Sequence, residues 1–267
     1  MNMKMYAGFL LSLCFGVSSA HAAVNLASAP LQTGGQVAPN VMFIIDDSGS
    51  MDRDYMPDDL YGYRRPTNGE WKCLRYNRWG QCQEWTVLYS GTDVEYPFYY
   101  AVEENAVYYD PNTTYDVPKK ADGETSWGTS TFTSAWTDGF SQSSAIDLTK
   151  EFNHSGTKYN GAFYYKYDTE LTACAALSEG ANKLRSEECY TYVDHTSMTA
   201  ADKQNFANWY SYYRTRILVS KSAISGAFHA QDGRMRIGYG SINKTTDYKG
   251  VRPFNGGHRT AFFDWLF

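Results

Sequence analysis

Three oxygen-bearing side chains stand at alternate positions near the start of the sequence, in Asp46-x-Ser48-x-Ser50. A tight loop can point alternate side chains into one small volume. Carboxylate and hydroxyl oxygens are the ligands that hard divalent cations such as Mg²⁺, Mn²⁺ or Ca²⁺ take. The spacing alone is a weak signal, so it predicts a metal site only if its neighbours place the loop at a suitable point of a fold.

The segment before this motif has the pattern of a buried strand. Val41 to Ile45 is a continuous apolar run, and Pro39-Asn40 bounds it on one side. Such a run is typical of a strand buried on both faces of a parallel sheet. Open α/β sheets bind ligands at the carboxyl ends of their strands, so the position of the loop agrees with its chemistry. The alternative is a Ser/Asp-rich turn or helix cap after a buried strand.

Two elements further along the chain complete an α/β pattern. A helix is predicted from Thr199, with Asp202 forming a variant of the capping box, to Gly233. Its apolar positions recur at three- or four-residue steps apart from one gap: Phe206, Tyr210, Tyr213, Ile217, Ile224 and Phe228. Arg234 to Asn243 alternates as a second strand, and Thr260 to Phe267 predicts the start of another helix. The long helix is expected to cover a face of the sheet.

Residues 52–198 differ in composition and periodicity from the rest of the chain. They show little helical periodicity and are crowded with aromatic residues, Gly, Asn, Asp and Thr, which predicts loops and short strands. The Tyr and Trp clusters suit a contact surface for sugar or protein. They suit equally well the core of a segment that is poor in Leu and Ile. Both interpretations stay open.

The first residues have the features of a secretory signal peptide. Lys4 precedes an apolar run from Ala7 to Val17, and small residues end in Ala20-His21-Ala22, which predicts cleavage after residue 22. The run is about eleven residues long, too short for the roughly twenty that span a bilayer. Residues 23–40 are expected to form an extended leader. No later segment is long and apolar enough to predict an integral membrane protein.

Export changes how the cysteines are interpreted, because an oxidising compartment favours disulfides. Four cysteines follow the signal peptide: Cys73, Cys82, Cys174 and Cys189. They allow three connectivities, and the short separations favour Cys73 with Cys82 and Cys174 with Cys189. The sequence contains no Cys-x-x-Cys pair, the spacing typical of zinc sites, so zinc is not predicted.

Composition and motifs argue against several function classes. The net charge is −5, with no basic stripe for nucleic acid. No G-x-S-x-G, H-E-x-x-H or P-loop is present, and the histidines are scattered, so no enzyme is predicted. Asp46 and Asp47 are neighbours on an extended segment and point in opposite directions, which does not suit a pair of catalytic carboxylates.

A second group of aspartates follows the loop closely: Asp52, Asp54, Asp58 and Asp59. An EF-hand needs Gly at its sixth position and Glu at its twelfth, and both are absent. This group is expected to be a solvated acidic patch.

Phe43 to Met51 resembles the first strand and metal-ion-dependent adhesion site of a von Willebrand factor A domain. In that family two serines bind the metal directly and the first aspartate acts through water, which carries over to Ser48, Ser50 and Asp46. A Thr and an Asp from two other loops would lie beyond Phe267. The resemblance implies an incomplete von Willebrand A-like parallel sheet over 41–267, with 52–198 as a disulfide-stapled insertion. It also implies a divalent cation that binds weakly or not at all in this truncated chain.

The insertion, together with Asn208 to Arg216 and Arg236 to Gly240, resembles the PilC/PilY group of type IV pilus tip-associated adhesin and biogenesis proteins. Tyr108 to Asn112 and the closing Phe263-x-Trp265-Leu266 strengthen the resemblance. It implies a role in pilus biogenesis, surface attachment and twitching motility. The implied partners are pilus subunits or minor pilins and a host or surface ligand, either protein or glycan.

The implied location is the pilus tip, cell surface, outer membrane or periplasm. Members of the group are longer and add a β-propeller, so this chain is expected to be a truncated gene product, a partial sequence or a frameshifted copy. Two alternatives remain: a secreted carbohydrate-binding module that works through the aromatic insertion, and a fragment with no function of its own.

Overall fold

The structure is a computed structural model that describes residues 38–63, 70–76, 82–88, 96–244 and 246–267, without the side chains of residues 61–95 and 157. The predicted signal peptide and most of the predicted leader lie outside the described residues. Within the described part of the chain, no helix combines the length and apolar character that crossing a membrane requires.

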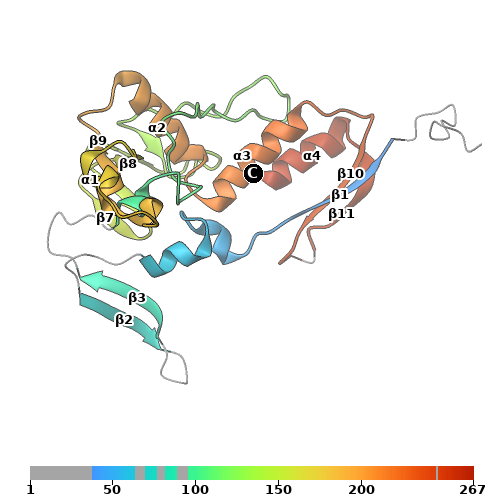
Figure 1. Cartoon of the computed structure of the whole chain (residues 1–267). Coiled ribbons are helices and arrows are strands. Elements are labelled where there is room, and N and C mark those ends of the chain that lie inside the picture. The colour runs from blue at the N-terminus through green and yellow to red at the C-terminus, as the bar shows by residue number, and fades with distance from the viewer. Residues whose placement is uncertain (1–37, 64–69, 77–81, 89–95, 245) are drawn as a thin grey trace, which may run out of the picture. The chain divides into compact units, whose positions relative to one another are not determined.

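A three-stranded sheet joins the two ends of the described chain (Figure 1). Its strands are β1 (Asn40–Ile45), β10 (Arg236–Ser241) and β11 (Lys249–Pro253), in the order β1-β10-β11. β1 runs parallel to β10, with Ile45 opposite Ser241, and β11 pairs antiparallel with β10. Both predicted strands are confirmed and the fold is mixed α/β, but the sheet is mixed rather than wholly parallel.

Two helices cover one face of this sheet: α3 (Arg216–His229) and α4 (Gly256–Leu266). Phe43 of β1 points toward them, with its ring 5.5 Å from that of Phe228 and 6.2 Å from that of Phe262. The core between the sheet and the helices is almost fully buried and consists of Ile237, Tyr239, Phe254, Phe262, Phe263 and Leu266.

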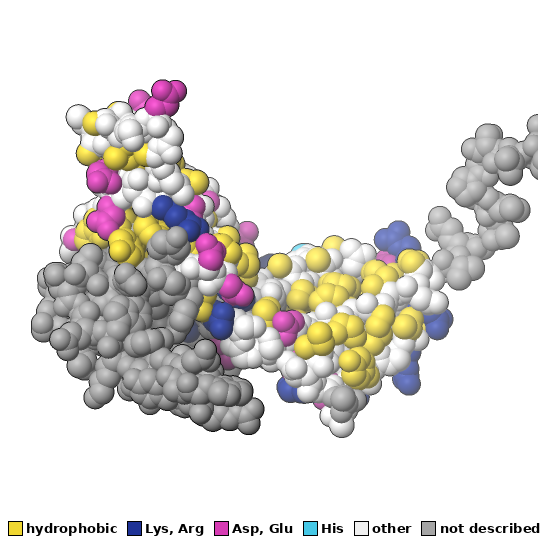
Figure 2. Space-filling view, turned by 60° about the horizontal axis from the view of Figure 1, so that its bottom comes forward, with side chains coloured by type: hydrophobic (Ala, Val, Ile, Leu, Met, Phe, Trp, Pro, Cys, Tyr) yellow, Lys and Arg dark blue, Asp and Glu magenta, His cyan; other side chains and the backbone are white. Residues whose placement is uncertain are grey.

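The other face of β1 is open, so the prediction of burial on both faces is wrong. Met42 is 47% exposed and Ile44 is 41% exposed. Successive side chains of a strand point to opposite faces, and among the described residues α3 and α4 cover only the face of Phe43 and Ile45. Figure 2 shows hydrophobic side chains on the surface of the right-hand part of the molecule, which carries the sheet.

The predicted long helix is in fact two helices, α2 (Ala200–Tyr212) and α3. The capping box is confirmed: Asp202 N donates to Thr199 Oγ1 over 3.1 Å, and Thr199 N donates to Asp202 Oδ2 over 3.0 Å. A second threonine, Thr215, accepts from Leu218 N over 3.4 Å and begins α3. The apolar period runs through this break because both helices bury aromatic or aliphatic side chains, so periodicity alone did not reveal it.

Short antiparallel strand pairs make up the insertion, as predicted. The pairs are β2 (Glu70–Tyr76) with β3 (Cys82–Leu88), β4 (Ala135–Trp136) with β5 (Ala145–Ile146), β6 (Phe152–His154) with β7 (Thr157–Tyr159), and β8 (Phe163–Tyr167) with β9 (Tyr190–Asp194). The helical turns are α1 (Thr172–Ala175) and 3₁₀ helices at Gly49–Asp52, Asp58–Tyr63, Pro97–Tyr100, Lys183–Arg185 and Glu187–Cys189.

The Cys174–Cys189 disulfide is confirmed and fully buried. It joins α1 to the 3₁₀ turn before β9. The predicted Cys73–Cys82 pair falls in the β2–β3 hairpin, where the register sets Tyr76 opposite Cys82. The side chains of this hairpin lie outside the described part of the chain, so that pairing stays a prediction.

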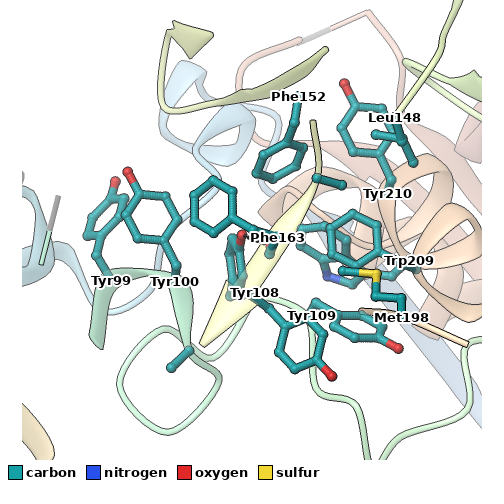
Figure 3. Packing of buried hydrophobic residues seen from close by; sticks show 14 of the residues in the cluster. Tyr99, Tyr100, Tyr108, Tyr109, Leu148, Phe152, Phe163, Met198, Trp209 and Tyr210 are labelled. Carbon is teal, nitrogen blue, oxygen red and sulfur yellow. Dashed lines mark hydrogen bonds between the residues drawn. The ribbon is translucent and has the colours of Figure 1, made fainter. Parts of the chain in front are cut away.

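An aromatic core fills the insertion (Figure 3). Tyr99, Tyr100, Tyr108, Tyr109 and Trp209 are each at most 1% exposed. Their polar atoms find partners inside: the Tyr108 hydroxyl donates to Phe163 O over 2.8 Å, and Trp209 Nε1 donates to Val107 O over 3.1 Å. These aromatic side chains therefore belong to the core and not to a contact surface. Because α2 supplies Trp209, this helix packs on the insertion, so of the two helices that replace the predicted long helix, α3 and not α2 covers the sheet.

Candidate metal centre

The Asp/Ser loop leaves the carboxyl end of β1 and turns at once into the 3₁₀ helix Gly49–Asp52. The turn brings the hydroxyl oxygens of Ser48 and Ser50 to within 2.9 Å of each other. Ser48 N donates to Asp46 Oδ1 over 2.9 Å, which folds the carboxylate back onto the loop. The structure thus gathers the three predicted oxygen-bearing side chains at one end of the sheet.

Hydrogen bonding keeps the carboxylate of the loop ionised. The backbone N–H of Ser48 and then its side chain lower the pKa of Asp46 below the ordinary value of 3.8. A metal ligand must be deprotonated to bind, so this environment suits the role predicted for Asp46.

The loop donors fit a small hard cation. Mg²⁺ binds oxygens at about 2.0–2.1 Å in octahedral geometry, so adjacent ligands lie about 2.9 Å apart. The Ser48 and Ser50 hydroxyls already have this spacing, here as a hydrogen bond. No group of three or more His, Cys, Asp or Glu side chains able to hold a metal occurs among the residues that the structure describes. The metal site at Asp46, Ser48 and Ser50 stays a prediction.

Asp47 faces the opposite way from Asp46. Its Oδ1 accepts from Asn243 N over 3.0 Å, and its Oδ2 lies 4.0 Å from Lys244 Nζ. Asp47 thus ties the loop to the segment after β10. Sequence reasoning did not identify this role, although the expectation that neighbouring carboxylates diverge was correct.

The four aspartates after the motif are not simply a solvated patch. Asp54 is 15% exposed at its side chain, accepts from Ser155 N and Oγ, and lies 3.3 Å from His154 Nδ1. Asp58 accepts from Arg216 Nη2 over 2.6 Å, and Asp59 from Arg185 Nη2 over 2.9 Å. The prediction of a solvated patch holds for Asp58 and Asp59, whose side chains are 70% and 55% exposed, and is wrong for Asp54, whose partner Ser155 lies 101 residues away in the sequence.

The segment Arg53–Asp58, which leads from the loop into the insertion, is held from two further sides. Arg216 at the start of α3 donates to Tyr55 O over 2.8 and 2.7 Å. Asn105, which is fully buried, accepts from Met56 N over 3.0 Å and donates to Asp54 O over 3.2 Å. The Asp/Ser loop is therefore connected to the insertion and to α3 through a hydrogen-bonded segment of backbone.

Sequence comparison identifies relatives over nearly the whole chain. The chain is 31% identical to the type IV pilus biogenesis factor PilY1 of Pseudomonas aeruginosa strain UCBPP-PA14, over 97% of its own length. The chain is homologous to PilY1. It is 30% identical to PilY1 of strain PAK over 92% of its length. The predicted resemblance to the PilC/PilY group is confirmed.

The chain spans about a fifth of the length of these PilY1 relatives, 21% in one strain and 20% in the other. No family model and no solved structure matches it. The buried Cys174–Cys189 disulfide is consistent with an exported protein.

Proposed function

We propose that this chain acts in type IV pilus biogenesis and surface attachment, as an exported, non-enzymatic protein at the pilus tip or outer surface. The observation that carries the proposal is the 31% identity to PilY1 along 97% of the chain. Pilus subunits or minor pilins, and a protein or glycan on the contacted surface, are the proposed partners.

We further propose that residues 41–267 form a von Willebrand A-type domain with 52–198 inserted. Three features support it: the parallel pairing of β1 with β10, the Asp/Ser loop at the carboxyl end of β1, and helices against the sheet. In open α/β sheets, this end of the strands is where ligands bind.

In the proposed site, Ser48 and Ser50 hold a divalent cation through their hydroxyl oxygens and Asp46 contributes its carboxylate. The hydroxyl spacing of 2.9 Å suits adjacent ligands of octahedral Mg²⁺ or Mn²⁺ and equally adjacent equatorial ligands of Ca²⁺, so the site is proposed for a divalent cation without a choice among the three. A bound cation would offer an open coordination position to a carboxylate of the partner. Asp47 keeps the loop in place from β10, since its own carboxylate is engaged by Asn243 N.

The test is the substitution Ser48→Ala in the full-length gene, assayed for twitching motility and attachment. Ser143→Ala, an exposed serine in the insertion, is the matched control. We expect the first variant to lose attachment at an unchanged protein level and the second to behave like wild type. Wild-type behaviour of Ser48→Ala would remove the metal from the mechanism.

Metal binding itself can be measured separately by calorimetric titration of Mg²⁺, Mn²⁺ and Ca²⁺ into the purified chain. We expect weak, saturable binding of a divalent cation that Ser48→Ala abolishes and Ser143→Ala retains. Circular dichroism of each variant would show that the fold is intact.

A further inference from the structure

A pocket of about 410 Å³ opens beside the first turns of α4, next to the edge strand β11. Its walls include Tyr239, Lys249, Arg252, Gly257 and His258. The volume lies within the range of small-molecule sites in proteins. None of these residues belongs to the Asp/Ser loop, so the pocket is separate from the proposed metal centre.

Two cations face this pocket from β11. Lys249 lies opposite Tyr239, and Arg252 lies opposite Ile237. Tyr239 and Ile237 are buried on the covered face of the sheet, so the residues paired with them lie on the side of this face. Neither cation forms an ion pair with any residue that the structure describes. Both residues are exposed where they line the pocket. Charges on an edge strand also discourage pairing with other chains, but that role needs neither a pocket nor further donors.

The first turn of α4 adds backbone donors to the same pocket. Asn255 precedes the helix and makes no side-chain capping hydrogen bond. The N–H groups of the first helical residues, with Gly257 in the pocket wall, are therefore left without the usual cap. Helix N-termini with free N–H groups favour anions.

Tyr239 supplies an observation independent of the helix terminus. Its side chain is fully buried, with its ring 5.5 Å from His258 and 4.9 Å from Trp265, and its hydroxyl has no hydrogen-bond partner among the described residues. Burial, followed by the charge of Asp264, raises the pKa of Tyr239, so the hydroxyl remains a donor at neutral pH. A buried donor without an acceptor calls for explanation, and a ligand oxygen would provide one.

His258 fits the same set of donors. Its Nε2 lies 2.7 Å from Ile237 O and must donate, because a carbonyl oxygen only accepts. This contact fixes the ring beside Tyr239, at the start of the helix. Cations, free amides and a phenol are all donors, and the described walls of the pocket include no carboxylate.

We propose that this pocket binds a phosphate-bearing small molecule or headgroup, with Lys249, Arg252 and the amides of the first turn of α4 around the phosphate and the Tyr239 hydroxyl as a further donor. A phosphate has several acceptor oxygens, and charge-assisted hydrogen bonds to them are the strong ones. The pocket is larger than a bare ion needs, so it leaves room for the rest of the molecule.

The experiment measures binding of inorganic phosphate and of glucose 6-phosphate to the purified chain by calorimetry. We expect saturable binding that weakens at least tenfold in Arg252→Gln and severalfold in Tyr239→Phe, which keeps the ring and removes only the hydroxyl. Arg234→Gln is the matched control, because the Arg234 side chain is 88% exposed and does not line the pocket. Equal weakening by Arg252→Gln and Arg234→Gln would overturn the proposal, as would no binding by folded protein.

Two further binding measurements test the role of Tyr239 and the source of the phosphate. Asp264→Asn removes the carboxylate whose charge acts on Tyr239, so phosphate should bind more tightly to this variant. Vesicles of phosphatidylglycerol, compared with vesicles of phosphatidylcholine, distinguish the source of the phosphate. Binding to the first kind that Arg252→Gln abolishes identifies a headgroup, and binding of glucose 6-phosphate alone identifies a soluble ligand.

Discussion

The insertion and the sheet bury their residues in different ways. In the insertion, aromatic side chains such as Tyr99 and Tyr100 are fully buried on all sides. In the sheet, one face is closed by α3 and α4, while Met42 and Ile44 are 47% and 41% exposed. The residues with metal-ligand chemistry lie at the end of the half-covered sheet. The comparison indicates that the insertion is the more completely buried region and that the sheet keeps an exposed apolar face.

The largest expected effect is in the aromatic core. Trp209→Ala removes a side chain that packs against Tyr108 and Phe206 and bonds to Val107 O. We expect a loss of roughly 3–5 kcal/mol in the free energy of unfolding, from lost burial and the cavity left behind. Urea denaturation followed by tryptophan fluorescence and circular dichroism measures it. A loss below about 1 kcal/mol would mean that the aromatic core is loosely packed. It would also mean that the insertion is not the more completely buried region.

The two faces of the sheet can be compared with one residue type. Ile237→Ala, on the covered face, should cost roughly 2–5 kcal/mol, whereas Ile44→Ala, 41% exposed on the open face, should cost well under that. Both variants are measured by the same denaturation. Equal costs would show that the open face is covered in the native protein.

Removal of the disulfide should produce an effect of similar order. Cys174→Ser with Cys189→Ser opens a loop with a sequence separation of 15, for which the chain-entropy model gives about 3 kcal/mol. Denaturation of the double variant, and of wild type with and without reductant, tests this. If reduction leaves wild-type stability unchanged, packing around α1 and β9 and not the crosslink holds this part of the insertion.

A smaller effect is expected at the start of α2. Thr199→Ala removes the hydroxyl that accepts from Asp202 N, and should cost about 1 kcal/mol. Thr199→Ser keeps the hydroxyl and serves as the control. A full loss in the serine variant would show that the methyl group, and not the cap, accounts for the stabilisation.

The smallest expected effect concerns pH at the metal loop. Since the pKa of Asp46 is lowered from 3.8, its carboxylate stays charged above that value and is protonated only as the pH falls below it. Metal binding that depends on Asp46 should therefore be constant from about pH 8 to about pH 5 and decline only as the pH falls toward and below 3.8. Calorimetric titration of Mg²⁺ at several pH values measures this. A decline between pH 8 and pH 6 would point to a histidine in the site.

Much of the site could be predicted because its signals are local. The spacing of Asp46, Ser48 and Ser50 and the apolar run before them lie within ten residues, and a short loop leaves few ways to arrange them. The capping box of Thr199 and Asp202 is local in the same sense. The second cap at Thr215 was equally local, but the apolar period across it concealed the break between α2 and α3.

The sequence by itself determined the strand-loop motif, the helix that Thr199 caps and the relationship to PilY1. In each case residues close together in the chain, or identity spread along the whole chain, carry the information. Only the tertiary structure decided that one face of β1 is open, that Asp54 and Asp58 are bound by His154, Ser155 and Arg216, and that the insertion's aromatic clusters are core. The two aspartates depend on partners about a hundred positions or more away, and the aromatic clusters on partners tens of positions away, so only the folded chain brings them together.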